Sequence, residues 1–219
     1  MNTFGWMKAA GLAFAMASAT LATSASAQVI GFSGFAQGCF SATACTPTNT
    51  ATLGGLTYVR SSFSVAAPFV VGGMAGIGNA TIGDNLGTFT LSNQVFNYTT
   101  AAQNFTLGVT FTLPVGTSPS QQTFNAVLTG NVVANGVGGV NVDFDNTPIA
   151  FAFSNAGQSG AFTLKVNDVT LTPGGFAVPV TGLITVTATP GPIAGSGFVA
   201  LLGLAGVIAF GRGRKSTEA

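Results

Sequence analysis

A two-residue alternation of apolar and polar side chains recurs along most of the chain and predicts β-strands. It is clearest over Asn104–Leu113, where Phe105, Leu107, Val109, Phe111 and Leu113 alternate with Thr106, Gly108, Thr110 and Thr112. Successive side chains of a strand point to opposite faces, so this segment has one apolar face and one hydroxyl-bearing face. No segment between the two chain ends shows the period of a helix.

The same period predicts a series of shorter strands separated by Gly, Pro, Asn and Asp. They are Leu56–Arg60, Ser62–Val71, Thr88–Ser92, Thr123–Thr129, Ile149–Phe153, Phe162–Val166, Val169–Leu171, Phe176–Val180 and Ile184–Ala188. Many short strands with turn residues between them indicate an all-β domain, and we expect an antiparallel β-sandwich of jelly-roll-like form.

Two segments do not follow the alternation. Phe32, Phe35 and Phe40 lie in a Gly-rich stretch without a clear period, and we expect them to pack over one end of the sandwich. Gly72–Gly78 is glycine-rich but has neither the lysine nor the strand-to-helix context of a phosphate loop, so we expect a flexible turn there.

The N-terminus has the three parts of a secretory signal peptide. Lys8 precedes the apolar stretch Ala9–Ala22, and small residues follow up to Ala25 and Ala27. We expect residues 1–27 to be removed by cleavage after Ala27.

The C-terminus has a second apolar run, the 18 residues of Ile193–Phe210, followed by the basic tail 211–219. As a helix this run would be about 27 Å long, close to the ~30 Å hydrocarbon core of a bilayer. We expect one transmembrane helix, with the basic tail on the cytoplasmic side. Between the two ends we expect an N-terminal segment, 28–51, and a β-sandwich domain, 52–189.

The last thirty or so residues resemble the C-terminal sorting signal of PEP-CTERM proteins. The features that carry this resemblance are Pro190, Gly191 and Pro192, the apolar run, and the cluster Arg212, Arg214 and Lys215. It implies that an exosortase in the inner membrane processes the signal and delivers the body to the cell surface or matrix. Gly191 replaces the family's glutamate, so a variant recognition sequence and a permanent membrane anchor both remain open.

The body, over about residues 52–188, resembles the choice-of-anchor K domain of secreted bacterial proteins. The motifs are Leu86–Thr90 followed by Ser92 and Asn93, the long alternating strand, and Val142–Pro148. This resemblance implies an exported domain held by an anchor, and it brings no enzymatic activity with it.

Charge and composition narrow the possible functions. Only 5% of the residues are charged, against roughly 25% in an ordinary soluble domain, and the net charge is +1. The hydrophobic fraction of 47% excludes a disordered chain, and the near-zero net charge gives no basis for binding nucleic acid. The chain has no histidine, which excludes histidine-dependent triads and the usual zinc sites. We expect no enzyme and no cofactor.

Two small groups of residues could carry chemistry. Cys39 and Cys45 are the only cysteines, and outside the cytoplasm we expect them to form a disulfide. Asn141, Asp143 and Asp145 fall on alternate positions, so on a strand their oxygens would face one way and could contribute to a Ca²⁺ site. The alternative is a solvent-facing strand that leads into a turn.

These observations predict a non-enzymatic, exported protein that is membrane-anchored and then displayed at the cell surface or in the extracellular matrix. Its expected partners are the export machinery, an exosortase-like enzyme, the inner membrane and extracellular polysaccharide. The alternatives are an extracellular carbohydrate- or calcium-binding module and a small outer-membrane β-barrel. The absence of an aromatic girdle disfavours the barrel, since the one tryptophan, Trp6, lies in the signal peptide.

Overall fold

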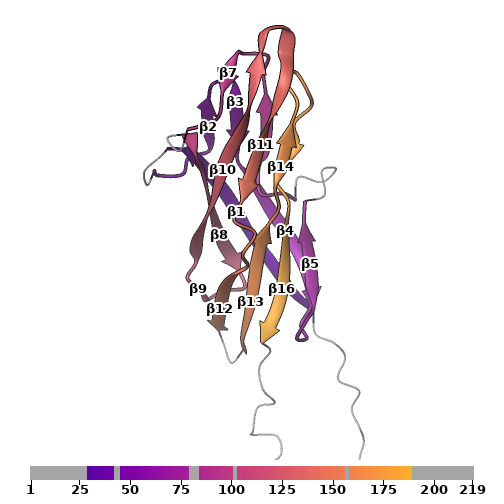
Figure 1. Ribbon diagram of the computed structural model, residues 1–219. Coiled ribbons are helices and arrows are strands. Elements are labelled where there is room, and N and C mark those ends of the chain that lie inside the picture. Colours follow the sequence, from indigo (N-terminus) through magenta and orange to yellow (C-terminus); the bar gives the residue numbers. More distant parts are fainter. Residues whose placement is uncertain (1–28, 42–44, 79–83, 101–102, 156–157, 189–219) are drawn as a thin grey trace, which may run out of the picture.

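A computed structural model describes residues 29–41, 45–78, 84–100, 103–155 and 158–188 of the chain (Figure 1). The expected signal peptide, 1–27, and the expected sorting segment, 190–219, lie outside the described residues. Within the described ranges the chain is all-β, and none of the helices found there is long and apolar enough to cross a membrane.

The largest sheet, here called the long sheet, is antiparallel throughout. Its order is β14 (Val169–Leu171), β11 (Val137–Phe144), β10 (Gln121–Val133), β8 (Phe105–Leu113), β1 (Val29–Phe40) and β4 (Ser61–Pro68), and the short β7 (Phe96–Asn97) also pairs with β10. The 13 residues of β10 extend over about 43 Å at the usual rise of a strand. The long sheet therefore runs most of the length of the molecule (Figure 1).

Two smaller antiparallel sheets contribute the other strands. The basal sheet has the order β5 (Met74–Ile77), β16 (Gly182–Ala188), β13 (Gln158–Val166), β12 (Ile149–Asn155) and β9 (Thr117–Ser118). The apical sheet has the order β15 (Val178–Pro179), β6 (Thr88–Leu91), β3 (Leu56–Val59) and β2 (Thr50–Leu53). The labelled strands of the two sheets lie over opposite halves of the molecule in Figure 1.

Aromatic contacts join the long sheet to both smaller sheets. Near the end of β8, the Phe111 ring lies 4.8 Å from Phe151 and 4.9 Å from Phe162 of the basal sheet, centroid to centroid. At the start of β8, the Phe105 ring lies 5.0 Å from Tyr58 and 4.9 Å from Phe89 of the apical sheet. One continuous apolar face therefore packs against two half-length layers, and the expected all-β, antiparallel, sandwich-like fold is confirmed.

The Gly-rich segment with Phe32, Phe35 and Phe40 does not pack over one end of the sandwich, so that expectation is wrong. It forms β1, which pairs with β4 on one side and with β8 on the other. The side chains of β1 alternate between the two faces without interruption, so Phe32 faces the core while Phe35, three residues later, lies on the outer face. The pairing with β8 shifts at Ser33/Gly34, where Thr112 of β8 is skipped. Downstream of the shift, small residues occupy the inward positions. A Cβ atom on Gly38, for example, would lie 2.3 Å from the Phe105 ring.

Two further expectations are corrected. The Gly72–Gly78 stretch is not simply a flexible turn, because Met74–Ile77 forms β5 against β16 and buries Ala75 and Ile77. The strand predicted at Phe176–Val180 is reduced to Val178–Pro179 of β15. Phe176 follows Gly174 and Gly175, outside the pairing with β6, and its side chain is 96% exposed.

The start and the end of the described body lie at the same end of the sandwich. Val29, the first residue of β1, pairs with Pro68 at the end of β4. Just beyond Pro68, the Gly72 N–H donates to the carbonyl of Val186, close to the last residue of β16. We call this the basal end. The opposite, apical end carries the turn Ala134–Gly136 between β10 and β11 (Figure 1).

Candidate functional site

The expected disulfide is present between Cys39, the second-last residue of β1, and Cys45. Their Cα atoms are 6.2 Å apart, within the usual range for a disulfide. Further along, the backbone of Thr48 exchanges two hydrogen bonds with Gly38, at 3.0 and 2.9 Å. The disulfide and this bridge together hold Cys45 and Thr48 against β1.

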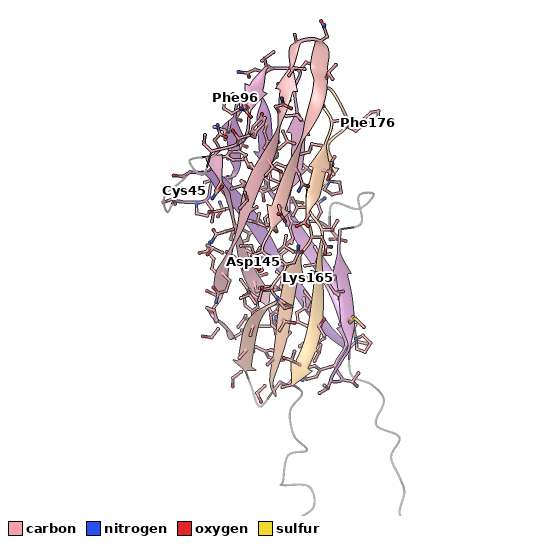
Figure 2. All side chains as sticks on the ribbon, viewed as in Figure 1. Cys45, Phe96, Asp145, Lys165 and Phe176 are labelled. Atoms are coloured by element: carbon pink, nitrogen blue, oxygen red, sulfur yellow. A yellow bond between two sulfur atoms is a disulfide. The ribbon has the colours of Figure 1, made fainter. Side chains whose placement is uncertain are left out.

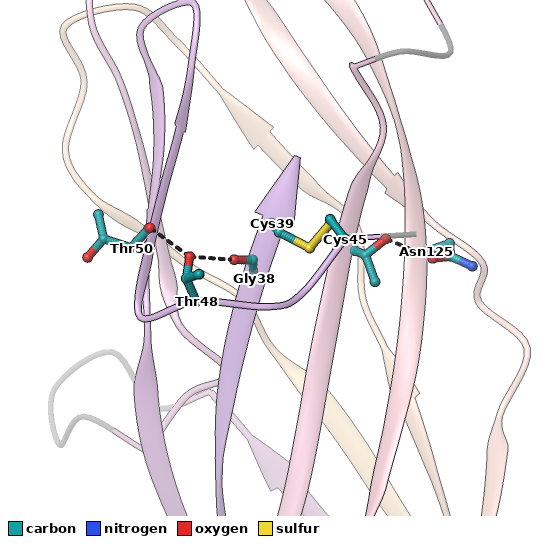
Figure 3. Close-up of a disulfide and its surroundings, with 7 residues drawn as sticks. Gly38, Cys39, Cys45, Thr48, Thr50 and Asn125 are labelled. Carbon is teal, nitrogen blue, oxygen red and sulfur yellow. Dashed lines mark hydrogen bonds between the residues drawn. A yellow bond between two sulfur atoms is a disulfide. The ribbon is translucent and has the colours of Figure 1, made fainter. Parts of the chain in front are cut away.

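Side chains extend this local network on the outer face of the long sheet (Figure 3). The Thr48 hydroxyl donates to the carbonyl of Thr50 at 2.9 Å and lies 3.3 Å from the carbonyl of Gly38. On the neighbouring strands, the Thr106 hydroxyl donates to Asn125 Oδ1 at 3.0 Å. The segment around Cys45 therefore lies over a polar surface of hydroxyls and amides, which suits a structural role for the disulfide.

The three calcium candidates do not form one set of free oxygens. Asn141 and Asp143 lie on β11, and Asn141 Oδ1 accepts a hydrogen bond from the Thr170 hydroxyl at 3.1 Å. Asp145 lies just beyond β11, where its Oδ1 accepts from the Thr147 N–H at 3.0 Å. Among the described residues there is no group of three or more His, Cys, Asp or Glu that could hold a metal ion.

The carboxylates near the end of β11 instead stabilise the turn after it. The hydrogen bonds from the side chain and the N–H of Thr147 hold the pKa of Asp145 below its ordinary value. Asp168 Oδ1 accepts from the Phe144 N–H at 2.9 Å, and both of its oxygens lie 3.2 Å from Asn146 Nδ2. This solvent-facing turn matches the alternative interpretation of the acidic residues.

A second polar group, which the sequence did not reveal, surrounds Phe35 on the outer face of the long sheet. The Arg60 guanidinium lies 5.7 Å from the centre of the Phe35 ring. Arg60 Nη1 and Gln37 Nε2 both donate to Asn49 Oδ1, at 2.9 and 2.8 Å. We call Phe35, Gln37, Asn49 and Arg60 the Phe35 patch. The only sign of this patch in the sequence is the three-residue spacing of Phe32 and Phe35, which places the two rings on opposite faces of a strand.

Two residues before Arg60, Tyr58 of β3 lies in the core, where its ring packs against Phe89 and Phe105. Its hydroxyl donates to the carbonyl of Leu86 at 2.9 Å, and its side chain is fully buried. Burial raises the pKa of the Tyr58 phenol, and the positive charge of Arg60 opposes this increase. A buried phenol with a hydrogen-bonded carbonyl acts here as a structural group rather than as an acid or base.

The other predicted site residues lie outside the described part of the chain. They are Ala25 and Ala27 of the signal-peptide cleavage site, and Pro190, Gly191, Pro192, Arg212, Arg214 and Lys215 of the sorting signal. Comparisons with known protein families, curated proteins and solved structures found no match.

Proposed function

We propose that this protein is a non-enzymatic, exported protein of the cell surface or extracellular matrix, sorted by its PEP-CTERM-like C-terminal signal. The observation that carries the proposal is the common position of the two body ends. β1 begins and β16 ends at the basal end, so both apolar terminal segments join the body on one side. This arrangement suits a body that is led across a membrane by one end and retained by the other.

Two properties of the body support the same proposal. The Cys39–Cys45 disulfide is typical of proteins that fold in an oxidising compartment. The outer face of the long sheet carries hydroxyls and amides, such as those of Thr106 and Asn125, with few charged side chains among them. The proposed partners are the export machinery, an exosortase-like enzyme, the inner membrane during anchoring, and extracellular polysaccharide.

Intact-mass measurement of the protein from inner membrane, envelope and culture medium tests this proposal. We expect a mass that corresponds to cleavage after Ala27 and, in the surface fraction, a second loss at the segment that begins with Pro190. Replacing Arg212, Arg214 and Lys215 with Gln should change membrane retention or processing. The matched control Lys165→Gln removes a cation from the body and should not. Full-length protein found only in the cytosol would contradict the proposal.

The Phe35 patch supports a second candidate function, the binding of an acidic polysaccharide. Aromatic rings pack against the apolar faces of sugars, and nearby amides and cations supply hydrogen bonds and charge. Arg60 provides the cation beside the ring, and Gln37 and Asn49 provide the amides.

Titration with acidic and neutral polysaccharides separates this function from a passive structural role. Phe35→Ala should weaken binding of the acidic polymer, whereas Phe176→Ala, which removes an exposed ring elsewhere, should leave it unchanged. Equal binding by both variants and the unmodified protein would exclude the patch.

A further inference from the structure

Six exposed aliphatic side chains lie at or near the basal end. They are Val29 (64% exposed), Val70 (44%), Val71 (68%), Met74 (60%), Leu113 (44%) and Val115 (54%). They come from the start of β1, the β4–β5 connection, the first residue of β5, and the end of β8 with the turn that follows. The start of β1, the start of the β4–β5 connection at Phe69, and the end of β8 with its turn meet around one open hollow of about 280 Å³. Its lining includes Val29, Phe69, Leu113, Val115 and Phe153 and also the polar Asn155 and Gln158. We call these six exposed aliphatic side chains, together with the hollow, the basal surface.

Charged groups are absent from this surface in the described part of the chain. The described body contains six charges: Arg60, Asp84, Asp143, Asp145, Lys165 and Asp168. Lys165 pairs across the basal sheet with Leu183, five residues before the end of β16. Asp84 accepts a hydrogen bond from Ser64, four residues before Pro68 at the end of β4. Figure 2 shows Asp145 and Lys165 near the middle of the molecule. The basal surface could thus enter the headgroup region without desolvating a charged side chain of the described body, and the new α-amino group that cleavage after Ala27 leaves beside Val29 could interact with lipid phosphates there.

The covalent structure sets a limit on how far this surface can lie from the apolar C-terminal run. β16 ends at Ala188, and the run begins at Ile193, five residues later. Five fully extended residues span at most about 17 Å. When the run Ile193–Phe210 lies in a bilayer, the basal surface is therefore held within reach of the headgroup region.

From these observations we propose that the basal surface is a lipid-docking surface, whose valine, leucine and methionine side chains enter the headgroup region of the membrane that anchors the chain. The inference rests on the proposed function, because it concerns the anchored form. The apical end also exposes aliphatic residues, such as Val133 and Val137, but neither end of the body lies there. Both the apolar surface and the adjacent anchor are needed for the argument, and only the basal end has both.

Site-specific fluorescence quenching in lipid vesicles tests the proposal on the full chain. Val71→Cys and Val115→Cys receive a thiol-reactive fluorophore, while the native cysteines remain in their disulfide. Val137→Cys is the matched control, because Val137 is 63% exposed and Val71 is 68% exposed. The vesicles contain phospholipids with a nitroxide in the headgroup region. We expect loss of fluorescence for labels at positions 71 and 115 and none for the label at 137.

The outcomes separate this inference from the function on which it rests. If the chain inserts in the vesicles but labels at 71 and 115 behave like the label at 137, lipid docking is excluded and the proposed function stands. If those labels are shielded from aqueous iodide but not quenched by the nitroxide lipid, a second copy of the chain covers the surface, and lipid docking is again excluded. If the full chain does not associate with vesicles at all, membrane anchoring fails and the inference fails with it.

Discussion

Phe105 is the position at which we expect a single truncation to cost the most stability. Its side chain is fully buried, and its ring contacts Phe40, Tyr58, Phe89 and Phe144 at centroid distances of 5.0, 5.0, 4.9 and 6.2 Å. Phe→Ala changes in well-packed cores cost about 3–5 kcal/mol, a large part of the stability of an ordinary domain. For Phe105→Ala we expect a decrease of about 2 M in the urea midpoint.

Urea unfolding of segment 28–189, followed by near-ultraviolet circular dichroism without reductant, measures this loss. The matched control is Phe176→Ala, since the Phe176 side chain is 96% exposed and its removal should change the unfolding free energy by less than about 0.5 kcal/mol. Equal midpoints for the two variants would refute the assignment of Phe105 to the centre of the core.

A second substitution tests the contact behind this expectation. A Cβ atom on Gly38 would lie 2.3 Å from the Phe105 ring and 2.8 Å from the Tyr58 ring, so Gly38→Ala alone should cost about 1–3 kcal/mol. Removing the Phe105 ring frees most of that space. The double variant should therefore be more stable than the sum of the two single losses predicts, and additivity within about 0.5 kcal/mol would contradict the packing.

Three further predictions concern the disulfide and two titrating groups. Replacing Cys39 and Cys45 with Ser should lower the unfolding free energy by about 2 kcal/mol in the same urea assay, because the short loop is no longer closed in the unfolded chain. Because the pKa of Tyr58 is raised in the folded state, stability should fall as the pH rises above the ordinary value of 10.0, and Tyr58→Phe should reduce this alkaline loss in a urea series. At neutral pH the same variant should cost about 1–3 kcal/mol through the unpaired Leu86 carbonyl. The pKa of Asp145, measured by NMR titration, should lie below the ordinary value of 3.8, and Thr147→Ala should raise this pKa. The stability that the Asp145 carboxylate contributes should be lost as the pH falls through its lowered pKa.

The sequence predicts strands well where bulky apolar residues occupy every inward position. The strand expected at Asn104–Leu113 corresponds to β8 at Phe105–Leu113, in which Phe105, Leu107, Val109 and Phe111 are all buried. The period is visible there because each inward residue is also a recognisably hydrophobic one.

The central strand β1 could not be predicted in the same way. Its inward positions after Phe32 are Gly34, Ala36 and Gly38, which carry no apolar signal in the sequence. Gly38 has no side chain because the rings of Phe105 and Tyr58 occupy the space that one would need. Its inward positions are small because neighbouring strands supply the volume, which is a property of the tertiary structure.

Of the candidate sites, the disulfide could be predicted from the sequence and the Phe35 patch could not. Cys39 and Cys45 could be paired from the sequence because the chain has no other cysteine. The Phe35 patch could not be predicted, because Asn49 and Arg60 reach Phe35 only through the folding of β2 and β3 back beside β1. A site built from neighbouring strands leaves no spacing motif in the chain.

The separation between the basal end and the β10–β11 turn has a practical consequence. Asn135, in the middle of this exposed turn, lies at the opposite pole of the molecule from Val29 and Ala188. A foreign peptide spliced in at Asn135 would be carried at the far tip of the molecule. The fold can thus serve as a presentation scaffold, because the inserted peptide and the membrane-attached end of the body lie at opposite ends of the molecule.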